Sequence, residues 1–198
     1  MTPAITDLSQ LDPSGTYSYA DYIKWQFDQR VELLRGKLFE MSPAPSVRHQ
    51  RIVGAIYVDL VKYFDTKPCQ LFIAPFDVRL YNRKKSIKAS KDIYTVVQPD
   101  VCVICDSTKL DEQGCNGAPD LVVEVLSPGN TKREMNQKFD LYQEAGVQEY
   151  WLVEPADEVV FVYVLNEQGQ YIGLRPMTEM LESALFPDLV IDLEKLFG

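Results

Sequence analysis

The sequence predicts an α/β (α+β) fold in which a central mixed β-sheet is flanked by helices. Two long segments carry the spacing of amphipathic helices, and short β-branched runs alternate with them along the chain. The order helix, hairpin, helix, strands, helix, strands is typical of one mixed domain. A chain of 198 residues can bury a substantial core. We therefore expect residues 1–198 to form a single domain, with residues 1–16 as a loose N-terminal arm.

The first elements are a short helix and a hairpin. Ser18 and Asp21 have the spacing of a capping box, which predicts a helix that runs to about Gln29. Two short strands, 31–34 and 37–41, then flank an Arg-Gly turn.

The middle of the chain is expected to hold a long helix and two strands. From residue 46 to about residue 66, apolar residues fall near one stripe, and Pro68 follows. β-Rich runs then predict strands over residues 70–81 and 96–105.

The C-terminal part repeats the pattern of strand, helix and strands. An apolar run over residues 120–126 predicts a strand, and a helix is expected over residues 132–145. Further strands are expected over 149–154, 159–165 and 170–174. We expect these strands to join one central sheet that mixes strand directions.

The four cysteines do not form a recognisable metal motif. Cys102 and Cys105 have CxxC spacing, which could indicate zinc or redox chemistry. No second CxxC or cluster of histidines completes such a site in the sequence. We interpret the cysteines as buried free thiols, since free cysteine behaves as a small hydrophobe.

The charge balance limits the possible partners. The chain has 29 acidic and 20 basic residues, a net charge of −9, which counts against strong non-specific binding to nucleic acid. A nucleic-acid role therefore needs a local basic patch, a metal ion, or both. The one dense basic segment, residues 82–91, is either a solvated loop or a phosphate-contacting loop. Its candidate contact residues are Arg83, Lys84, Lys85 and Lys88.

The sequence gives no sign of a membrane segment. No apolar run approaches the roughly 20 residues that span a bilayer. The N-terminus also lacks the apolar region of a signal peptide. We expect a cytoplasmic protein with no membrane partner.

Glu124 is the first candidate for chemistry, because it lies inside an apolar strand where a carboxylate must be paired or bind metal. Asp120 would lie on the same strand about 13 Å away, too far for one ion to bridge. Asp100 lies on another strand, and neighbouring strands about 4.8 Å apart would bring it and Glu124 onto one Mg²⁺. The alternatives are a turn aspartate at Asp100 and a salt-bridge carboxylate at Glu124. We expect Asp120 to bind the backbone or cap the strand entry.

Lys138 is the second candidate. A capping box at Thr131 and Glu134 and a stop at Gly146 place Lys138 on the apolar arc of the helix. A lysine on a buried face needs a carboxylate or a substrate phosphate. The alternative is a side chain that extends its amine to solvent. As a catalytic group, Lys138 would orient the attacking water or stabilise charge in the transition state.

Pro99-Asp100 and Glu124-Val125-Leu126 resemble the core motif of the PD-(D/E)xK nuclease superfamily, which has Pro-Asp on one strand and Glu-x-Lys on the next. Leu126 stands where the lysine is expected, and Lys138 fits the branches in which the lysine lies on the following helix.

From about Tyr17 to Phe197 the chain is similar to the Uma-type restriction endonuclease family. The resemblance is carried by segments 32–38, 98–101, 119–128 and 145–153, together with Ser42-Pro43, 49–53, Lys138 and Tyr142.

The resemblance implies a restriction-endonuclease-like fold and an endonuclease that hydrolyses phosphodiester bonds with Mg²⁺ (or Mn²⁺). It favours DNA as the nucleic acid and a homodimer as the assembly. It also makes Glu40 a possible additional acid of the metal site. His49 could join the site, but a surface or capping histidine is favoured over a catalytic base. The rival hypothesis is a non-catalytic nucleic-acid-binding or protein-interaction module on a nuclease scaffold.

Overall fold

The computed structural model describes residues 4–41, 45–82, 90–129 and 131–198. The basic residues Arg83, Lys84, Lys85 and Lys88 lie outside these described residues, so their predicted contact with phosphate stays a prediction.

The described residues form two six-stranded mixed sheets and a two-stranded hairpin. The N-terminal sheet has the order β2 (Lys37–Glu40), β1 (Val31–Leu34), β5 (Thr95–Val97), β4 (Val78–Leu80), β8 (Gly114–Asn116) and β7 (Leu110–Asp111). The central sheet has the order β12 (Tyr171–Gly173), β11 (Val159–Leu165), β10 (Glu149–Glu154), β9 (Leu121–Val125), β6 (Val101–Ile104) and β3 (Gln70–Ile73). The hairpin pairs β13 (Met180–Glu182) with β14 (Val190–Asp192).

The helices are α1 (Tyr19–Tyr22), α2 (Val47–Phe64), α3 (Lys132–Ala145) and α4 (Leu193–Phe197). Three short 3₁₀ turns, η1 (Leu8–Gln10), η2 (Ser90–Asp92) and η3 (Ser107–Lys109), complete the elements of the described chain. None of the helices in the described part of the chain is long and apolar enough to cross a bilayer.

The two long helices cover opposite faces of the central sheet, because side chains alternate along each strand. Val123 of β9 packs in the core cluster that contains Ile56 of α2. Val122, its neighbour, packs in the cluster that contains Leu141 of α3. Glu124 has the same parity as Val122 and therefore faces α3.

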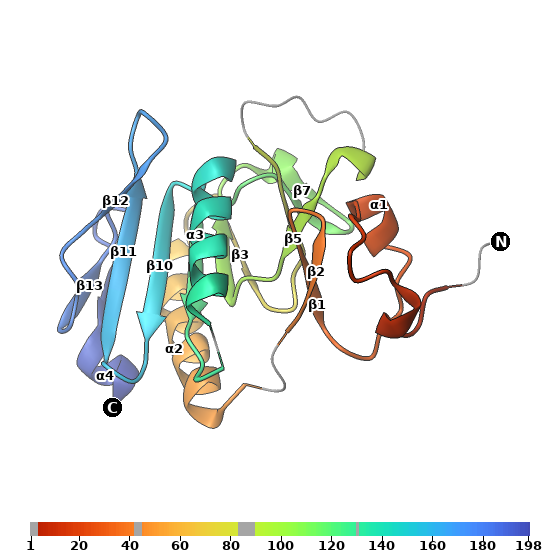
Figure 1. The fold of residues 1–198 in the computed structure, drawn as a ribbon. Helices are drawn as coiled ribbons and strands as arrows, with labels where there is room; N and C mark the ends of the chain where they lie inside the picture. Colours follow the sequence, from red (N-terminus) through yellow and green to blue (C-terminus); the bar gives the residue numbers. More distant parts are fainter. Residues whose placement is uncertain (1–3, 42–44, 83–89, 130) are drawn as a thin grey trace.

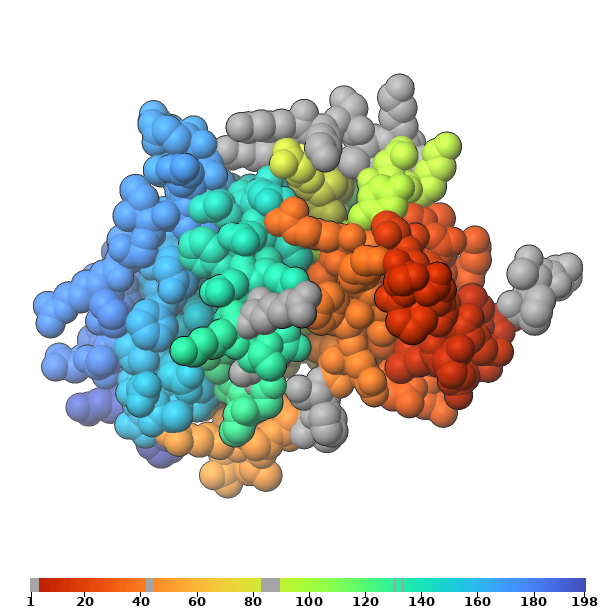
Figure 2. All heavy atoms as spheres, viewed as in Figure 1, coloured from red at the N-terminus to blue at the C-terminus, as the bar shows by residue number. Residues whose placement is uncertain are grey.

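Helix α3 also contacts the N-terminal sheet. Leu34 of β1 and Val97 of β5 belong to the same buried cluster as Leu141. Figure 1 shows α3 between the central sheet and the β1–β2 hairpin. Figure 2 shows the same helix and hairpin side by side on the molecular surface. The fold therefore places β1, β9 and α3 around one region.

The fold agrees with the expected mixed architecture but divides two of the expected strands. Segment 70–81 forms β3 in the central sheet and β4 in the N-terminal sheet. Pro75 lies between them and has no amide hydrogen to continue a ladder. Segment 96–105 divides in the same way into β5 and β6, with Pro99 between them. The strands thus form two sheets where one central sheet was expected.

The helix expected over 18–29 is also wrong in extent, since α1 ends at Tyr22. Beyond it the chain pairs with the N-terminal segment: Trp25 forms a bridge with Ile5, and the Gln26 amide donates to the Ile5 carbonyl. This pairing replaces further helical turns. The expected single domain and loose arm stay predictions.

The prediction for the cysteines holds for Cys102 and Cys115, which are buried free thiols, but not for Cys69 and Cys105, which form a disulfide. The two half-cystines are brought together because β3 pairs with β6. Disulfides are rare in a reducing cytosol, so this bond is at odds with the expected cytoplasmic location.

Candidate active site

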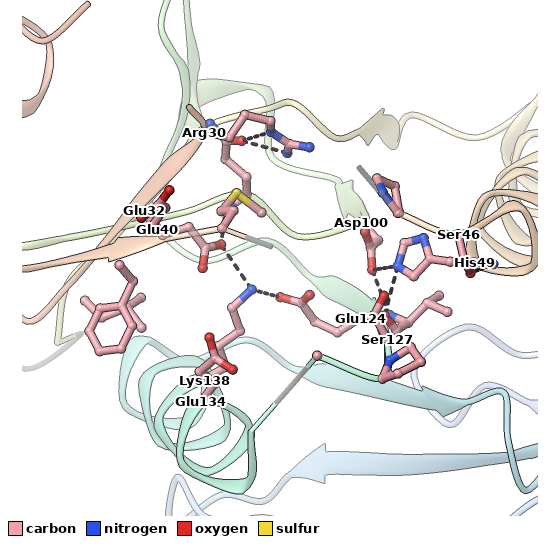
Figure 3. A pocket seen from close by; sticks show the side chains of 18 residues that line it. Arg30, Glu32, Glu40, Ser46, His49, Asp100, Glu124, Ser127, Glu134 and Lys138 are labelled. Carbon is pink, nitrogen blue, oxygen red and sulfur yellow. Dashed lines mark hydrogen bonds and ion pairs between the residues drawn. The ribbon is translucent and has the colours of Figure 1, made fainter. Parts of the chain in front are cut away.

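Lys138 joins two carboxylates from different sheets. Its Nζ lies 2.9 Å from Oε1 of Glu124 on β9 and 3.0 Å from Oε1 of Glu32 on β1. The side chains of Lys138, Glu32 and Glu124 are 16%, 6% and 12% exposed. Lys138 therefore does not extend its amine to solvent, and Figure 3 shows it pointing between the two acids.

The position of Lys138 follows from the way α3 is built. Thr131 caps the helix and forms a capping box with Glu134. Gly146 ends it in a left-handed conformation with φ 93°, which glycine adopts without a Cβ clash. These two ends fix the register, so that Lys138 and Tyr142 lie one turn apart on the face that meets β9. The Tyr142 hydroxyl donates to Glu124 Oε1 at 2.6 Å.

Strand pairing brings Asp100 beside Glu124. β6 and β9 are antiparallel neighbours, with Val101 opposite Val123. Continuing this register by one residue places Asp100 opposite Glu124. Oδ2 of Asp100 accepts the Val125 amide at 2.8 Å, so the carboxylate is anchored to the strand that carries Glu124.

His49 faces Asp100 from the start of α2. Its Nε2 lies 3.3 Å from Asp100 Oδ2 and 3.0 Å from the Val125 carbonyl oxygen. Both neighbours are acceptors, so Nε2 carries a proton in this arrangement. Nδ1 is buried and has no hydrogen-bond partner among the described residues. His49 is therefore not the surface histidine that the sequence favoured.

The charged groups of this cluster shift one another's pKa values. Burial raises the pKa of Glu124 to about 7 against the attraction of Lys138, and the charges of Asp100 and Glu32 add to the rise. Burial lowers the pKa of Lys138, but Glu124 and Glu32 outweigh it and raise this pKa above its ordinary value. Both pKa values are raised, but the rise favours the charged form of Lys138 and the neutral form of Glu124, because one cation serves two carboxylates. Lys138 is therefore charged, and Glu124 is incompletely compensated.

The pKa of His49 is raised as well. Burial lowers this pKa, but the hydrogen bond to Asp100 and the negative charge of Asp100 outweigh burial. The histidine is thus held near the carboxylate both by geometry and by charge.

These groups line one pocket of about 410 Å³. Besides the residues already named, it is lined by Arg30, Glu40, Ser46, Gln98 and Glu134, among others. Glu32 and Glu40 both line the pocket, but Glu40, at the end of β2, is exposed, whereas Glu32 is buried and contacts Lys138. Glu32, Asp100 and Glu124 line this pocket together with Lys138 and His49 (Figure 3).

Glu32 was not among the candidates from the sequence. Its Oε1 accepts the Gln98 amide at 2.8 Å and pairs with Lys138. It therefore ties the segment that carries Asp100 to α3. The sequence feature that could have identified Glu32 is a carboxylate within the apolar run Val31–Leu34. The same kind of feature identified Glu124.

Asp120 lies away from this pocket and has a structural role, as the sequence indicated. Its Oδ2 accepts the Cys105 amide at 2.7 Å, and Oδ1 accepts from the Gln148 side chain at 3.0 Å. These bonds fix the entry to β9.

The donor set suits a hydrated divalent ion better than a closed protein cage. Within the described ranges, no group of three or more His, Cys, Asp and Glu side chains is arranged to hold a metal ion. Mg²⁺, however, is usually bound by one or two carboxylates and completes its shell with waters and substrate phosphates. Asp100 and Glu124, opposite each other and open to the pocket, fit this mode.

The architecture is a mixed α+β fold that this chain shares with a solved protein. A crystal structure from Anabaena variabilis ATCC 29413, described as "a putative nuclease belonging to DUF820", matches with a TM-score of 0.71. It covers 91% of this chain and 97% of that one at 19% identity, a likeness that shows the shared fold.

The sequence comparisons narrow the class to a family. An uncharacterized protein of Synechocystis sp. (strain ATCC 27184 / PCC 6803 / Kazusa), slr1290, is 27% identical over 165 residues, which are 82% of this chain and 81% of that one. The Uma2 family model, described as "Putative restriction endonuclease", matches residues 19–194. The chain belongs to the Uma2 family, and this membership supports a nuclease function.

Proposed function

We propose that this protein is a divalent-metal-dependent endonuclease that hydrolyses phosphodiester bonds, with Asp100, Glu124 and Lys138 as its catalytic residues. The proposal rests on one observation: these three side chains, from the residue before β6, from β9 and from α3, line the same pocket. A buried lysine and the carboxylates beside it shift one another's pKa values, and groups with shifted pKa values are common at functional sites.

Asp100 and Glu124 would hold Mg²⁺ or Mn²⁺. When bound, such an ion neutralises phosphate charge and lowers the pKa of a bound water. His49 Nε2 carries a proton beside Asp100 and the Val125 carbonyl, so it would orient Asp100 for the ion instead of binding the ion directly. Glu40 is a weaker addition, because its side chain is exposed at the pocket lining.

Lys138 would act on the substrate side of the pocket. An ammonium has three N–H donors, and the bonds to Glu32 and Glu124 engage two of them. The third can donate to a water or to a phosphate oxygen. Because the two acids keep the lysine charged, it can orient the nucleophilic water and stabilise negative charge on phosphorus-bound oxygens.

The second candidate function is a non-catalytic nucleic-acid-binding or protein-interaction module on the same scaffold. The observation that favours it is Leu126, which occupies the usual lysine position, together with the net charge of −9. DNA as substrate and a homodimeric assembly belong to the first proposal through the family resemblance. A cytoplasmic location, expected from the sequence, stays a prediction, and the Cys69–Cys105 disulfide counts against it.

A cleavage assay separates the two functions. Wild-type protein is incubated with duplex DNA, single-stranded DNA and RNA, with Mg²⁺, with Mn²⁺ or with EDTA. The proposal expects cleavage that needs the metal and is lost in Glu124→Gln but retained in Glu112→Gln, a change at an exposed turn. Absence of cleavage of all three substrates by wild type with either metal would favour the non-catalytic module.

A further inference from the structure

A second hollow adjoins the catalytic pocket at the base of β1. It measures about 470 Å³ and is lined by Tyr22, Trp25, Phe27, Arg30, Asp77 and Gln98, among others. Val31 lines this aromatic pocket and Glu32 lines the catalytic one, since successive strand residues point to opposite faces. Arg30 and Gln98 line both, so the two pockets meet at these residues.

The aromatic pocket contains partly exposed aromatic side chains. Trp25 and Phe27 are half-buried, with ring centroids 5.4 Å apart and planes 34° apart. The ring of Tyr22 also packs against Trp25, with centroids 5.6 Å apart. Aromatic side chains of this kind stack on the bases of unpaired nucleic acid.

The pocket also contains the carboxylate of Asp77, which can bind a polar ligand. Asp77 Oδ1 accepts from the Gln98 side-chain amide at 2.8 Å and from the Tyr22 hydroxyl at 3.2 Å. A carboxylate has about four lone-pair positions, so these two bonds leave it able to accept from a ligand. The base edge best matched to a carboxylate is that of guanine, which presents two adjacent N–H groups.

Arg30 can connect this pocket with the scissile phosphate. Its Nε and Nη2 donate to Gln98 Oε1 at 3.1 and 2.8 Å, and its side chain is exposed. A guanidinium has five N–H donors and binds phosphate readily. Gln98 is two residues from Asp100, a separation of at most about 7 Å along the chain.

We propose that the aromatic pocket binds an unpaired nucleobase, preferably guanine, next to the phosphate that enters the catalytic pocket. The substrate class is then single-stranded or locally unpaired nucleic acid, because a base within a duplex cannot enter between Trp25 and Asp77. This inference rests on the proposed nuclease function and specifies its substrate.

Tryptophan fluorescence can test the pocket without any cleavage. Trp25 and Trp151 are the two tryptophans of the chain, and Trp151 is 0% exposed in the central sheet. In EDTA, a guanine-containing DNA strand should quench Trp25 saturably, and the same strand annealed to its complement should not. Phe27→Leu should weaken this binding about tenfold, as expected for loss of one base–aromatic contact.

The matched control is Tyr94→Leu, which removes another exposed aromatic ring that lines a different pocket. It should leave the affinity unchanged. Asp77→Asn keeps the shape but loses the charge, and it should abolish the preference for a guanine-containing strand over a thymine-only strand.

The outcomes separate the two proposals. Equal quenching by single strand and duplex, or unchanged affinity in Phe27→Leu, would overturn the nucleobase pocket whatever the cleavage assay shows. Selective quenching in a protein that cleaves nothing would support the pocket and refute the nuclease. Selective quenching retained in a cleavage-deficient Glu124→Gln supports both.

Discussion

Replacing Lys138 with methionine should destabilise the protein strongly, because it removes the cation shared by Glu32 and Glu124. Both carboxylates are nearly buried, so solvent cannot replace the lysine. Breaking a buried ion pair by removing one partner costs about 3–5 kcal/mol. We expect a loss of that size in the free energy of unfolding at pH 8, where the carboxylates of the unfolded chain are charged and those of the folded variant must either stay charged without the lysine or take up a proton.

The loss should depend on pH. The folded pKa of Glu124 is already raised to about 7 with the lysine present, and removing the cation can only raise it further. A carboxyl group with a raised folded pKa binds more protons when folded, so it destabilises the fold as pH rises above the unfolded pKa of about 4.3. The deficit of Lys138→Met should therefore shrink at pH 5.

Urea unfolding of wild type and variant at pH 5 and pH 8 measures both effects. Lys62→Met is the matched control, because Lys62 pairs with Asp59 at the surface and is 69% exposed. It should change the unfolding free energy by less than about 1 kcal/mol. A deficit in Lys138→Met no larger than that of the control, or equal at both pH values, would refute the reasoning.

Three further predictions concern the site and its supports. Metal-dependent cleavage should increase with pH through about 7, since metal binding requires the deprotonated form of Glu124. At a higher Mg²⁺ concentration the midpoint of the pH–rate profile should therefore lie at a lower pH. A midpoint independent of Mg²⁺ would argue against Glu124 as a ligand. Tyr142→Phe removes the 2.6 Å hydrogen bond to Glu124 and should lower the free energy of unfolding in urea by about 1–3 kcal/mol. It should also shift the same pH–rate profile to higher pH, because the bond stabilises the charged form of Glu124. An unchanged profile would contradict this role of Tyr142. Gly146→Ala should lower the free energy of unfolding by about 1 kcal/mol or more, because residue 146 has a left-handed φ of 93°. Gly54→Ala should raise it by up to about 1 kcal/mol, because Gly54 lies in α2 with open space around it. Equal melting temperatures for the two variants would contradict the argument.

The parts of the molecule that sequence patterns predicted well are those with local signals. Helix α3 begins at the capping box of Thr131 and ends at Gly146, as the sequence indicated. The placement of Lys138 on the buried face followed from the same periodicity. The neighbouring positions of Asp100 and Glu124 were a hypothesis about strand order, and β6 does pair with β9.

The parts that were missed depend on contacts between distant segments. The partner of Glu32 is on α3, far along the chain, so its apolar surroundings alone could not give it a role. His49 is a single histidine at a helix start, and only the fold brings it against Asp100. The division of segment 70–81 into β3 and β4 reflects a change of sheet, which no periodicity records.

A calorimetric titration of Mn²⁺ tests most directly the central claim that Asp100 and Glu124 together hold one divalent ion. The wild-type protein should bind one ion at this site, and Asp100→Asn and Glu124→Gln should each weaken that binding by about 100-fold or more, beyond the range for outer-shell groups. Asp106→Asn, a change at the cap of η3, should leave it unchanged. Equal affinity for Mn²⁺ in the wild type and both site variants would contradict the claim.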